Sequence, residues 1–292
     1  MNFNFLELKK LICTSYANSP IARTELYDLP SLQENKKLPY MIEITEVPDI
    51  NGDGATDLSD IDLLLRNNNN VLTILDGDGD FRSEECIEFL KEADIVVTNP
   101  PFSLFHDFIA QIMKYKKDFL IISNTNALSY KDVFRLFQQD RIRTGYTKFN
   151  TGMFFRVPDY WEKYTKIVDG IKMVRVSTSC WLTSLPVSKH KEDIICYEKY
   201  SPEKYPKYDN YDAINVNKYT SIPCDYNGVM GVPITFLDKY NPKQFEIIGQ
   251  MVTTKVDEYN YGYPYIKGKK IYARILIRKI HSEGGEDENR AA

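Results

Sequence analysis

The chain has 292 residues and a formal net charge of −4, with 43% hydrophobic and 27% charged residues. This composition permits a sizeable core in one or two domains and excludes a wholly disordered chain. No stretch reaches the roughly 18 apolar residues of a membrane helix, and Glu7, Lys9 and Lys10 interrupt any signal-peptide pattern. The five cysteines form no CxxC pair, which favours a reduced, cytoplasmic protein without zinc or disulfides.

Strands and helices alternate along the first half of the chain. Short apolar runs predict strands at residues 11–14, 40–47, 71–75, 95–98 and 119–122. Apolar residues at helical spacing predict helices at residues 58–65, 83–92, 104–113 and 130–138. Ser83 and Ser103 stand where N-caps are expected for two of these helices. Because the strands are continuously apolar, we expect both faces to be buried, as in an α/β fold with a doubly wound, mostly parallel sheet.

The alternation fades after about residue 158, where tyrosine, lysine and proline become frequent. One more strand-like stretch, CWLTSL at residues 180–185, precedes a soft boundary near residue 190. We therefore expect a first domain over residues 1–190 and a smaller C-terminal region over residues 191–281. The acidic tail over residues 282–292 is expected to be disordered.

The fourth predicted strand ends in an unusual turn. The stretch DIVVTNPPF, residues 94–102, places an amide, two prolines and an aromatic ring directly after the apolar run. In open α/β sheets, ligands bind outside the carboxyl ends of the strands. Asn99 offers a carbonyl acceptor there, while Pro100 and Pro101 make the turn rigid. Phe102 adds a flat face on which a ring can stack.

These residues suit a planar heterocycle that carries an exocyclic amino group. The Asn99 side-chain oxygen and the Pro100 carbonyl can each accept one amino hydrogen, which frees the nitrogen lone pair to attack an electrophile. The amino proton can leave after the transfer, so no strong base is required. The alternative interpretation is a plain turn that ends a strand. The apolar residues before the turn and the aromatic residue after it favour the functional interpretation.

The stretch DIVVTNPPFSLF resembles the catalytic motif of adenine-specific DNA methyltransferases, (D/N/S)-P-P-(Y/F). Further segments are similar to one family, the EcoRI-type adenine methyltransferases, and extend over most of the chain. They are GDGDFRSEECIEFLKEADIVVTNPPFSLF, FLIISNTNALSYKDVF, CWLTSL and YPKYDNYDAINVNK…IPCDYNGVMGVPITFLDKYNPKQFEI.

The resemblance implies the fold of S-adenosylmethionine-dependent methyltransferases and a restriction–modification function. Such an enzyme transfers a methyl group from S-adenosylmethionine to N6 of an adenine in double-stranded DNA, and flips that base out of the stack. The implied catalytic residues are Asn99, Pro100, Pro101 and Phe102. We expect a monomer that acts in the cytoplasm without a membrane.

The resemblance also implies a donor site at GDGDF, residues 77–81. Related methyltransferases use an acid and its neighbour at this strand end. Asp80 is expected to accept from the amino group of the donor's adenine, and Phe81 to pack on its ring. Thr14, at the end of the first strand, is expected to approach the donor. The alternative is a plain Asp-Gly turn.

Family members usually carry a further N-terminal region with an F-Y-T-like segment and a C-N-C-D-D-P-like strand end, which contribute the first half of the donor site. The present sequence starts after that point, so a second hypothesis is a non-catalytic DNA-binding remnant that lacks half of the donor site. A third hypothesis, methylation of RNA or of protein amides, is disfavoured by the long segments shared with DNA enzymes.

The segment DINGDGATDLSD, residues 49–60, fits the calcium-loop pattern D-x-[DN]-x-[DN]-G with an acid at the twelfth position. The candidate ligands are Asp49, Asn51, Asp53, Asp57 and Asp60. A strand is predicted to enter the loop where a calcium loop has a helix, and the alternative is a solvated acidic turn. Any ion would be structural, because methyl transfer needs no metal.

Candidates for DNA contact are dispersed. A loose basic set follows the strand at residues 119–122 and comprises Lys131, Arg135, Arg141, Arg143 and Lys148. Residues 197–219 interleave tyrosine with lysine, and here Asn210, Asn215 and Asn217 could pair with adenine edges. The alternative for each is a solvated surface with packed tyrosines.

Overall fold

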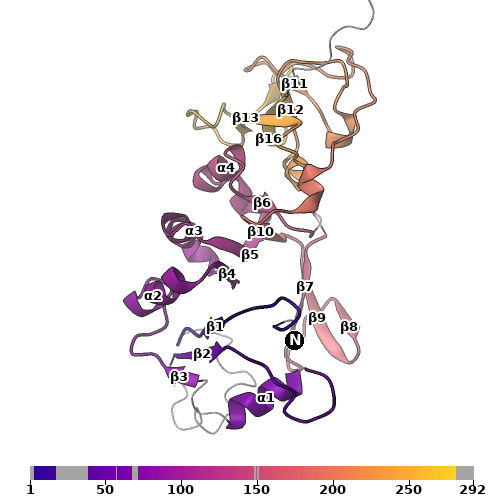
Figure 1. Ribbon diagram of the computed structural model, residues 1–292. Coiled ribbons are helices and arrows are strands. Elements are labelled where there is room, and N and C mark those ends of the chain that lie inside the picture. The colour runs from indigo at the N-terminus through magenta and orange to yellow at the C-terminus, as the bar shows by residue number, and fades with distance from the viewer. Residues whose placement is uncertain are drawn as a thin grey trace, which may run out of the picture. The chain divides into compact units, whose positions relative to one another are not determined.

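The computed structural model describes residues 3–17, 39–56, 58–67, 72–147, 149 and 151–280. The chain divides into two units, residues 1–94 and residues 95–292, whose elements are labelled in Figure 1. Among the helices described, none has the length and apolar character needed to cross a membrane.

An antiparallel sheet organises the first unit. Its strands, in spatial order, are β1 (Leu11–Thr14), β2 (Tyr40–Ile44) and β3 (Leu72–Ile74). Alternate residues of β2 point inward, because successive side chains of a strand face opposite sides. The buried core residues are Phe3, Tyr40, Ile42, Ile44, Val47 and Ile61. Ile61 belongs to helix α1 (Leu58–Asn67), which therefore covers the inner face of the sheet.

Helix α2 (Glu84–Glu92) follows β3 and begins at the predicted N-cap. The Ser83 hydroxyl accepts from the Cys86 N–H at 3.2 Å, which satisfies one of the amides that a helix start leaves unpaired. Glu84 and Glu85 in the first turn add favourable charge at the positive end of the helix dipole.

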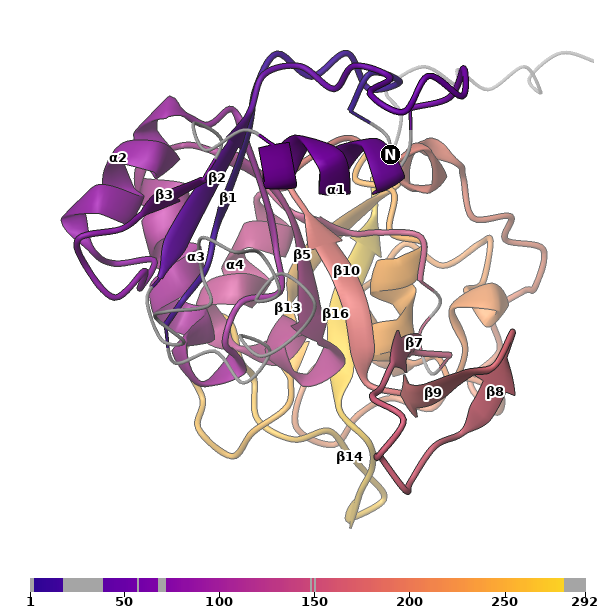
Figure 2. The ribbon, with the colours of Figure 1, turned by 90° about the horizontal axis from the view of Figure 1, so that it is seen from below.

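The second unit starts with a four-stranded sheet. Its strands, in spatial order, are β4 (Ile95–Thr98), β5 (Asp118–Asn124), β10 (Ser179–Thr183) and β6 (Arg143–Thr144). β4 runs parallel to β5, whereas β10 is antiparallel to both of its neighbours. Helices α3 (Phe105–Lys114) and α4 (Lys131–Gln138) follow β4 and β5 and lie beside them (Figure 2). The largest fully buried side chains here are Phe105, Phe119, Phe134, Phe137, Ile112, Ile121, Leu128, Ile142 and Leu182.

A separate three-stranded antiparallel sheet is inserted between β6 and β10. Its strands, in spatial order, are β7 (Met153–Arg156), β9 (Ile171–Val176) and β8 (Lys166–Val168). Asp169 and Gly170 connect β8 to β9 with positive φ angles of 50° and 78°. Two successive positive φ values are typical of the tight turn that matches the twist of a hairpin.

The C-terminal part forms another sheet against α4. Its strands, in spatial order, are β11 (Ile214–Asn215), β12 (Met230–Val232), β16 (Arg274–Lys279) and β13 (Phe245–Met251). A short hairpin of β14 (Tyr265–Ile266) and β15 (Lys269–Lys270) precedes β16. The Gln138 amide at the end of α4 donates to the Ile247 and Ile248 carbonyls at 3.2 and 3.1 Å, which joins the helix to β13.

The structure confirms the predicted elements but not the predicted sheet. The strands and helices predicted between residues 11 and 138 are present within a few residues of their expected ends. A doubly wound, mostly parallel sheet is not seen: among the strands described, only β4–β5 and β11–β12 pair in parallel. The strands are instead distributed over several small mixed sheets, an arrangement compatible with a methyltransferase fold.

Two local predictions are also corrected. Ser103 is not an N-cap, because it lies inside a 3₁₀ turn (Phe102–Leu104) and Leu104 precedes α3 without a side-chain cap. β4 is not buried on both faces, since Ile95 and Val97 are 47% and 65% exposed. Continuous apolar character therefore indicated a strand correctly but overestimated its burial.

Candidate active site

The NPPF turn lies at the carboxyl end of β4, as the sequence predicts. Thr98 is paired with Ile121 of β5, and Asn99 follows directly with an exposed side chain. The next residue, Pro100, is buried. Within the described part of the chain, neither the Asn99 side chain nor the Pro100 carbonyl has a hydrogen-bond partner. Two acceptors on adjacent residues, one on an exposed side chain and one on a buried residue, are therefore not committed to hydrogen bonds within the described part of the chain.

Pro101 and Phe102, the next two residues, differ in their contacts and exposure. The Pro101 carbonyl accepts from the Leu104 N–H at 3.0 Å, which starts the 3₁₀ turn and leaves this carbonyl committed to the fold. The Phe102 ring remains 50% exposed, whereas Phe105, three residues later, is 2% exposed and anchors α3. The buried Phe105 thus anchors the turn, and Phe102 leaves an aromatic face exposed two residues after Pro100.

The carboxyl end of β5 lies at the same sheet edge and carries a second asparagine. Asn124 donates to the Thr178 hydroxyl at 3.2 Å, and the Thr125 N–H donates to the Thr178 carbonyl at 2.7 Å. These bonds attach the strand end to the start of β10. Sequence reasoning did not single out Asn124, although it stands after an apolar strand as Asn99 does.

An aromatic pair also lies where α3 and α4 begin. The His106 and Tyr130 rings stack with centroids 4.8 Å apart, and His106 Nδ1 lies 3.6 Å from a carboxylate oxygen of Asp132. Helices that follow parallel strands start at the edge where those strands end. The pair was not found from the sequence: His106 stands four residues after the NPPF motif, but Tyr130 is 24 residues further along the chain.

The predicted donor residues lie in the first unit, where two segments meet. The N–H of Ala17, shortly after β1, donates to the Asp78 carbonyl at 2.9 Å. This bond brings the exposed end of β1, with Thr14, next to the GDGDF turn. The structure therefore assembles the segments of Thr14, Asp80 and Phe81, which are far apart in the sequence.

Asp80 is held by its neighbour in the turn. Arg82 donates to both carboxylate oxygens of Asp80 at 2.9 Å, and the Arg82 N–H donates at 2.8 Å. These hydrogen bonds lower the pKa of Asp80 below its ordinary value of 3.8, against the opposing effect of partial burial. The Arg82 guanidinium also lies over the half-buried Phe81 ring, 5.4 Å from its centroid. The turn is thus a rigid element with an ionised carboxylate.

Comparison with known proteins identifies the family of the chain. The family model described as "Adenine-specific methyltransferase EcoRI" matches residues 1–280. The chain belongs to this EcoRI-type family of adenine-specific methyltransferases. It is 40% identical over 291 residues to the type II methyltransferase M.EcoRI of Escherichia coli, a match that covers 95% of this chain and 79% of the relative. No solved structure matches.

Two mycoplasma proteins are also similar. The type II methyltransferase M.MgeORF184P of Mycoplasma genitalium is 38% identical over 248 residues, 78% of each chain. The type II methyltransferase M.MpnI of Mycoplasma pneumoniae is 38% identical over 224 residues, 70% of each chain. The chain is therefore an adenine methyltransferase of the restriction–modification type, as the NPPF motif indicated.

The acidic segment at residues 49–60 of this methyltransferase is a hydrogen-bonded turn. Asp49 accepts from the Gly52 and Gly54 N–H groups at 2.7 and 2.9 Å, and the wholly buried Asp60 accepts from the Ile50 N–H at 2.8 Å. Among the described residues, no group of three His, Cys, Asp or Glu side chains could hold a metal ion.

The predicted calcium loop consequently receives no support. The Asn51 amide donates to Asp53 at 2.9 Å, so these two side chains bind each other, and Asp57 lies outside the described residues. The carboxylates of Asp49 and Asp60 accept hydrogen bonds from backbone amides, as short polar side chains do in turns. Residues 49–56 are explained as a turn that follows β2 and precedes α1.

The basic set of this methyltransferase has partners within the chain. Lys131 and Arg135 lie over the Tyr259 ring, 5.5 and 4.9 Å from its centroid, and Lys131 is also 3.5 Å from Asp257. Arg143 binds Asp140 at 3.0 Å. Arg141 is exposed, and Lys148 lies outside the described residues. The set does not form one bare cationic face, so its predicted role in DNA contact stays a prediction.

The asparagines predicted to read adenine edges form hydrogen bonds within the chain, and one of them is buried. Asn215 is 5% exposed, and its side-chain oxygen accepts from the Tyr208 hydroxyl and from Arg274, each at 3.0 Å. Its amide donates to Asn217 at 2.9 Å, and Asn210 donates to the Tyr263 carbonyl at 3.0 Å. The prediction is therefore wrong for Asn215, because a buried amide with satisfied hydrogen bonds is not available to a base.

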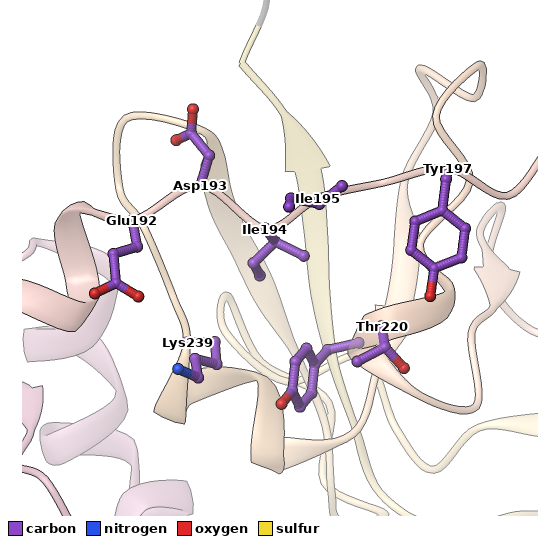
Figure 3. A pocket seen from close by; sticks show the side chains of 8 residues that line it. Glu192, Asp193, Ile194, Ile195, Tyr197, Thr220 and Lys239 are labelled. Carbon is purple, nitrogen blue, oxygen red and sulfur yellow. The ribbon is translucent and has the colours of Figure 1, made fainter.

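A surface hollow of about 270 Å³ lies elsewhere in the second unit (Figure 3). Its lining includes Glu192, Asp193, Tyr197 and Lys239. None of the predicted catalytic or donor-binding residues lines it. The hollow is consequently distinct from the candidate active site.

Proposed function

We propose that this methyltransferase transfers a methyl group from S-adenosylmethionine to N6 of an adenine that is flipped out of double-stranded DNA. The Asn99 side-chain oxygen and the Pro100 carbonyl hold the two amino hydrogens, and Phe102 stacks on the adenine ring. Pro101 fixes the turn through its bond to Leu104. The observation that carries this proposal is the pair of adjacent, unpartnered acceptors at the carboxyl end of β4.

Hydrogen bonding to the amino group explains how the site promotes the reaction. Two acceptors draw the nitrogen away from conjugation with the ring and expose its lone pair. The rigid prolines orient these acceptors before the base arrives, so little ordering is required when the base binds. The proton leaves after transfer and needs only an ordinary acceptor such as water.

The donor-binding residues in this proposal are Asp80, Phe81 and Thr14. When bound, the donor supplies an electrophilic methyl group. Asp80 accepts from the exocyclic amino group of its adenine, using carboxylate lone pairs that Arg82 leaves open, because an ionised carboxylate has about four acceptor sites. Phe81 offers a ring face, and the contact between Ala17 and Asp78 supports a shared site with the end of β1.

The family membership favours an enzyme over a non-catalytic DNA-binding remnant. We propose that residues 1–190 form the catalytic domain and residues 191–281 the target-recognition region. We further propose that the enzyme acts as a monomer in the cytoplasm, where the donor and chromosomal DNA are present.

An Asn99→Ala variant tests the catalytic assignment. Incorporation of tritiated methyl groups from S-adenosylmethionine into unmethylated genomic DNA is expected to disappear, while affinity for the same DNA remains. Asn99→Asp is the matched control, because a carboxylate keeps the acceptor, and measurable methylation is expected. Full activity of Asn99→Ala would refute the role of this side chain.

Calorimetric titration with S-adenosylmethionine tests the donor assignment separately. The wild-type chain is expected to bind the donor, and Asp80→Ala to bind it at least about tenfold more weakly, as loss of a charge-assisted hydrogen bond implies. Absence of binding to the wild type would favour the non-catalytic remnant.

A further inference from the structure

The sheet inserted between β6 and β10 is an unusual element of the second unit. We call residues 153–176 the aromatic arm: strands β7, β9 and β8 with the loop 157–165 that joins β7 to β8. No residue of the arm is buried. An isolated small sheet without a buried face is only marginally stable in water, so the arm has open surfaces that a partner can cover.

The loop of the arm exposes large aromatic rings while its backbone is fixed. Tyr160, Trp161 and Tyr164 are 81%, 48% and 46% exposed. The Lys172 ammonium of β9 donates to the Asp159 and Trp161 carbonyls at 2.6 and 3.2 Å. Aromatic side chains displayed on a restrained loop bind a partner with little loss of conformational entropy.

The charge of the arm is opposite to that of the chain. Residues 153–176 contain five basic and three acidic residues, a net charge of +2, so the remainder of the chain carries −6. Lys163 stands between two of the aromatic residues, is exposed, and has no partner in the described ranges. Lys166 lies over the Phe154 ring at 3.9 Å. Positive charge interleaved with aromatic rings suits a nucleic acid, which offers phosphates and base faces together.

The arm is attached at the edge of the sheet that carries the NPPF turn. Ser179, the first residue of β10, pairs with Asn124, the last residue of β5. The Ser179 hydroxyl accepts from the Met153 N–H at 2.9 Å and donates to the Val176 carbonyl at 2.7 Å, which joins both ends of the arm to β10. Because β4 and β5 are parallel, their carboxyl ends share this edge, so the arm leaves the sheet at the edge where Asn99 follows β4, two strands away in the sheet order.

We propose that the aromatic arm binds duplex DNA beside the target adenine, a role that rests on the proposed function. Lys163 contacts a backbone phosphate, and Tyr160 and Trp161 stack on bases that lose a neighbour when the adenine leaves the helix. Base flipping exposes such faces, and aromatic stacking on an exposed base is worth about 1–3 kcal/mol. The arm thus stabilises the DNA conformation in which the adenine can reach Asn99.

A double variant, Tyr160→Ala with Trp161→Ala, tests the stacking contact. Its affinity for unmethylated genomic fragments, measured by fluorescence anisotropy, is expected to fall about tenfold or more. Tyr160→Phe with Trp161→Phe keeps both rings and is expected to bind as the wild type does. Donor binding by calorimetry is expected to be unchanged in both, because these residues lie outside the proposed donor site.

Lys163→Gln tests the phosphate contact independently. Loss of one phosphate contact lowers the slope of log affinity against log salt concentration by about 1. Lys114→Gln, an exposed lysine in the last turn of α3 and outside both the arm and residues 191–281, serves as the charge-matched control and is expected to keep the wild-type slope.

The outcomes separate the arm from the proposed function. If the wild type methylates DNA but the alanine double variant binds it with unchanged affinity, the arm proposal is wrong and the proposed function stands. If the wild type neither binds nor methylates DNA, the proposed function itself fails. Weaker binding by the alanine variant alone, with the phenylalanine variant intact, supports the stacking role.

Discussion

Gly79 lies against the backbone of Ser15 so closely that a Cβ atom on Gly79 would be 2.2 Å from the Ser15 carbonyl oxygen. Gly79 also has a φ of 75°, a conformation that side chains with a Cβ rarely adopt. The contact joins the GDGDF turn to the chain after β1, and these are the two segments of the proposed donor site. Glycine at this position is therefore required by both space and backbone geometry.

Gly79→Ala is expected to destabilise the first unit by at least about 1–2 kcal/mol, because the left-handed conformation and the contact with Ser15 both disfavour a Cβ. Donor affinity is expected to fall with it. Gly77→Ala is the matched control, since its new Cβ would meet no atom closer than 3.8 Å. Thermal unfolding and donor calorimetry measure the two effects. Equal stability of both variants would contradict the required contact.

Asp80 is expected to make the stability of the enzyme depend on acid pH. Its pKa is lowered by Arg82, so the folded state binds the proton less readily than the unfolded state. The resulting stabilisation is fully present above the ordinary pKa of 3.8 and is lost as pH falls through the lower folded value. Urea unfolding of the wild type and Asp80→Asn should therefore differ by a constant amount above about pH 5 and converge in stronger acid. A constant difference at every pH would contradict this linkage.

Phe102→Ala is expected to reduce kcat/KM for DNA methylation by about 10- to 100-fold, the loss of one stacking contact with a base. Stability should change little, because the ring is 50% exposed and leaves no cavity. Phe102→Tyr keeps the aromatic face and is expected to retain activity. Steady-state kinetics and thermal unfolding distinguish this local role from a general loss of folding.

Lys189 and Asp238 form an ion pair at 2.6 Å in which Lys189 is 8% exposed, and Lys189 also donates to the Gly145 carbonyl. Lys189→Ala would leave the Asp238 carboxylate poorly solvated and is expected to cost about 3–5 kcal/mol of unfolding free energy. Lys191→Ala, two residues away and exposed, should change it by no more than about 0.5 kcal/mol. Denaturant unfolding measures both. A small effect of Lys189→Ala would show that water replaces the lost partner.

The sequence predicted local elements well because local interactions determine them. Ser83 is an N-cap with the expected bond to the Cys86 amide, and the NPPF turn follows β4 as its apolar run indicated. Ser103 failed as a cap because Pro101 started a 3₁₀ turn first. The capping pattern does not reveal such competition between neighbouring turns.

Tertiary arrangement was predicted less well because it depends on pairing between distant segments. The sequence could not show that β10 is antiparallel to β5, or that Asn215 is buried against Tyr208 and Arg274. The aromatic arm was missed although Asp169-Gly170 is a strong hairpin signal between two β-branched runs. The residues after 158 were interpreted by their frequent tyrosine, lysine and proline, and the hairpin signal was therefore overlooked.

The bonds of the Ser179 hydroxyl to Met153 and Val176 have an architectural consequence. Because the chain departs and returns at one point of β10, the intervening segment can be lengthened, shortened or exchanged with little displacement of the catalytic scaffold. A replacement of the segment between Met153 and Val176 is therefore expected to change the arm while the strands that carry the NPPF turn keep their places.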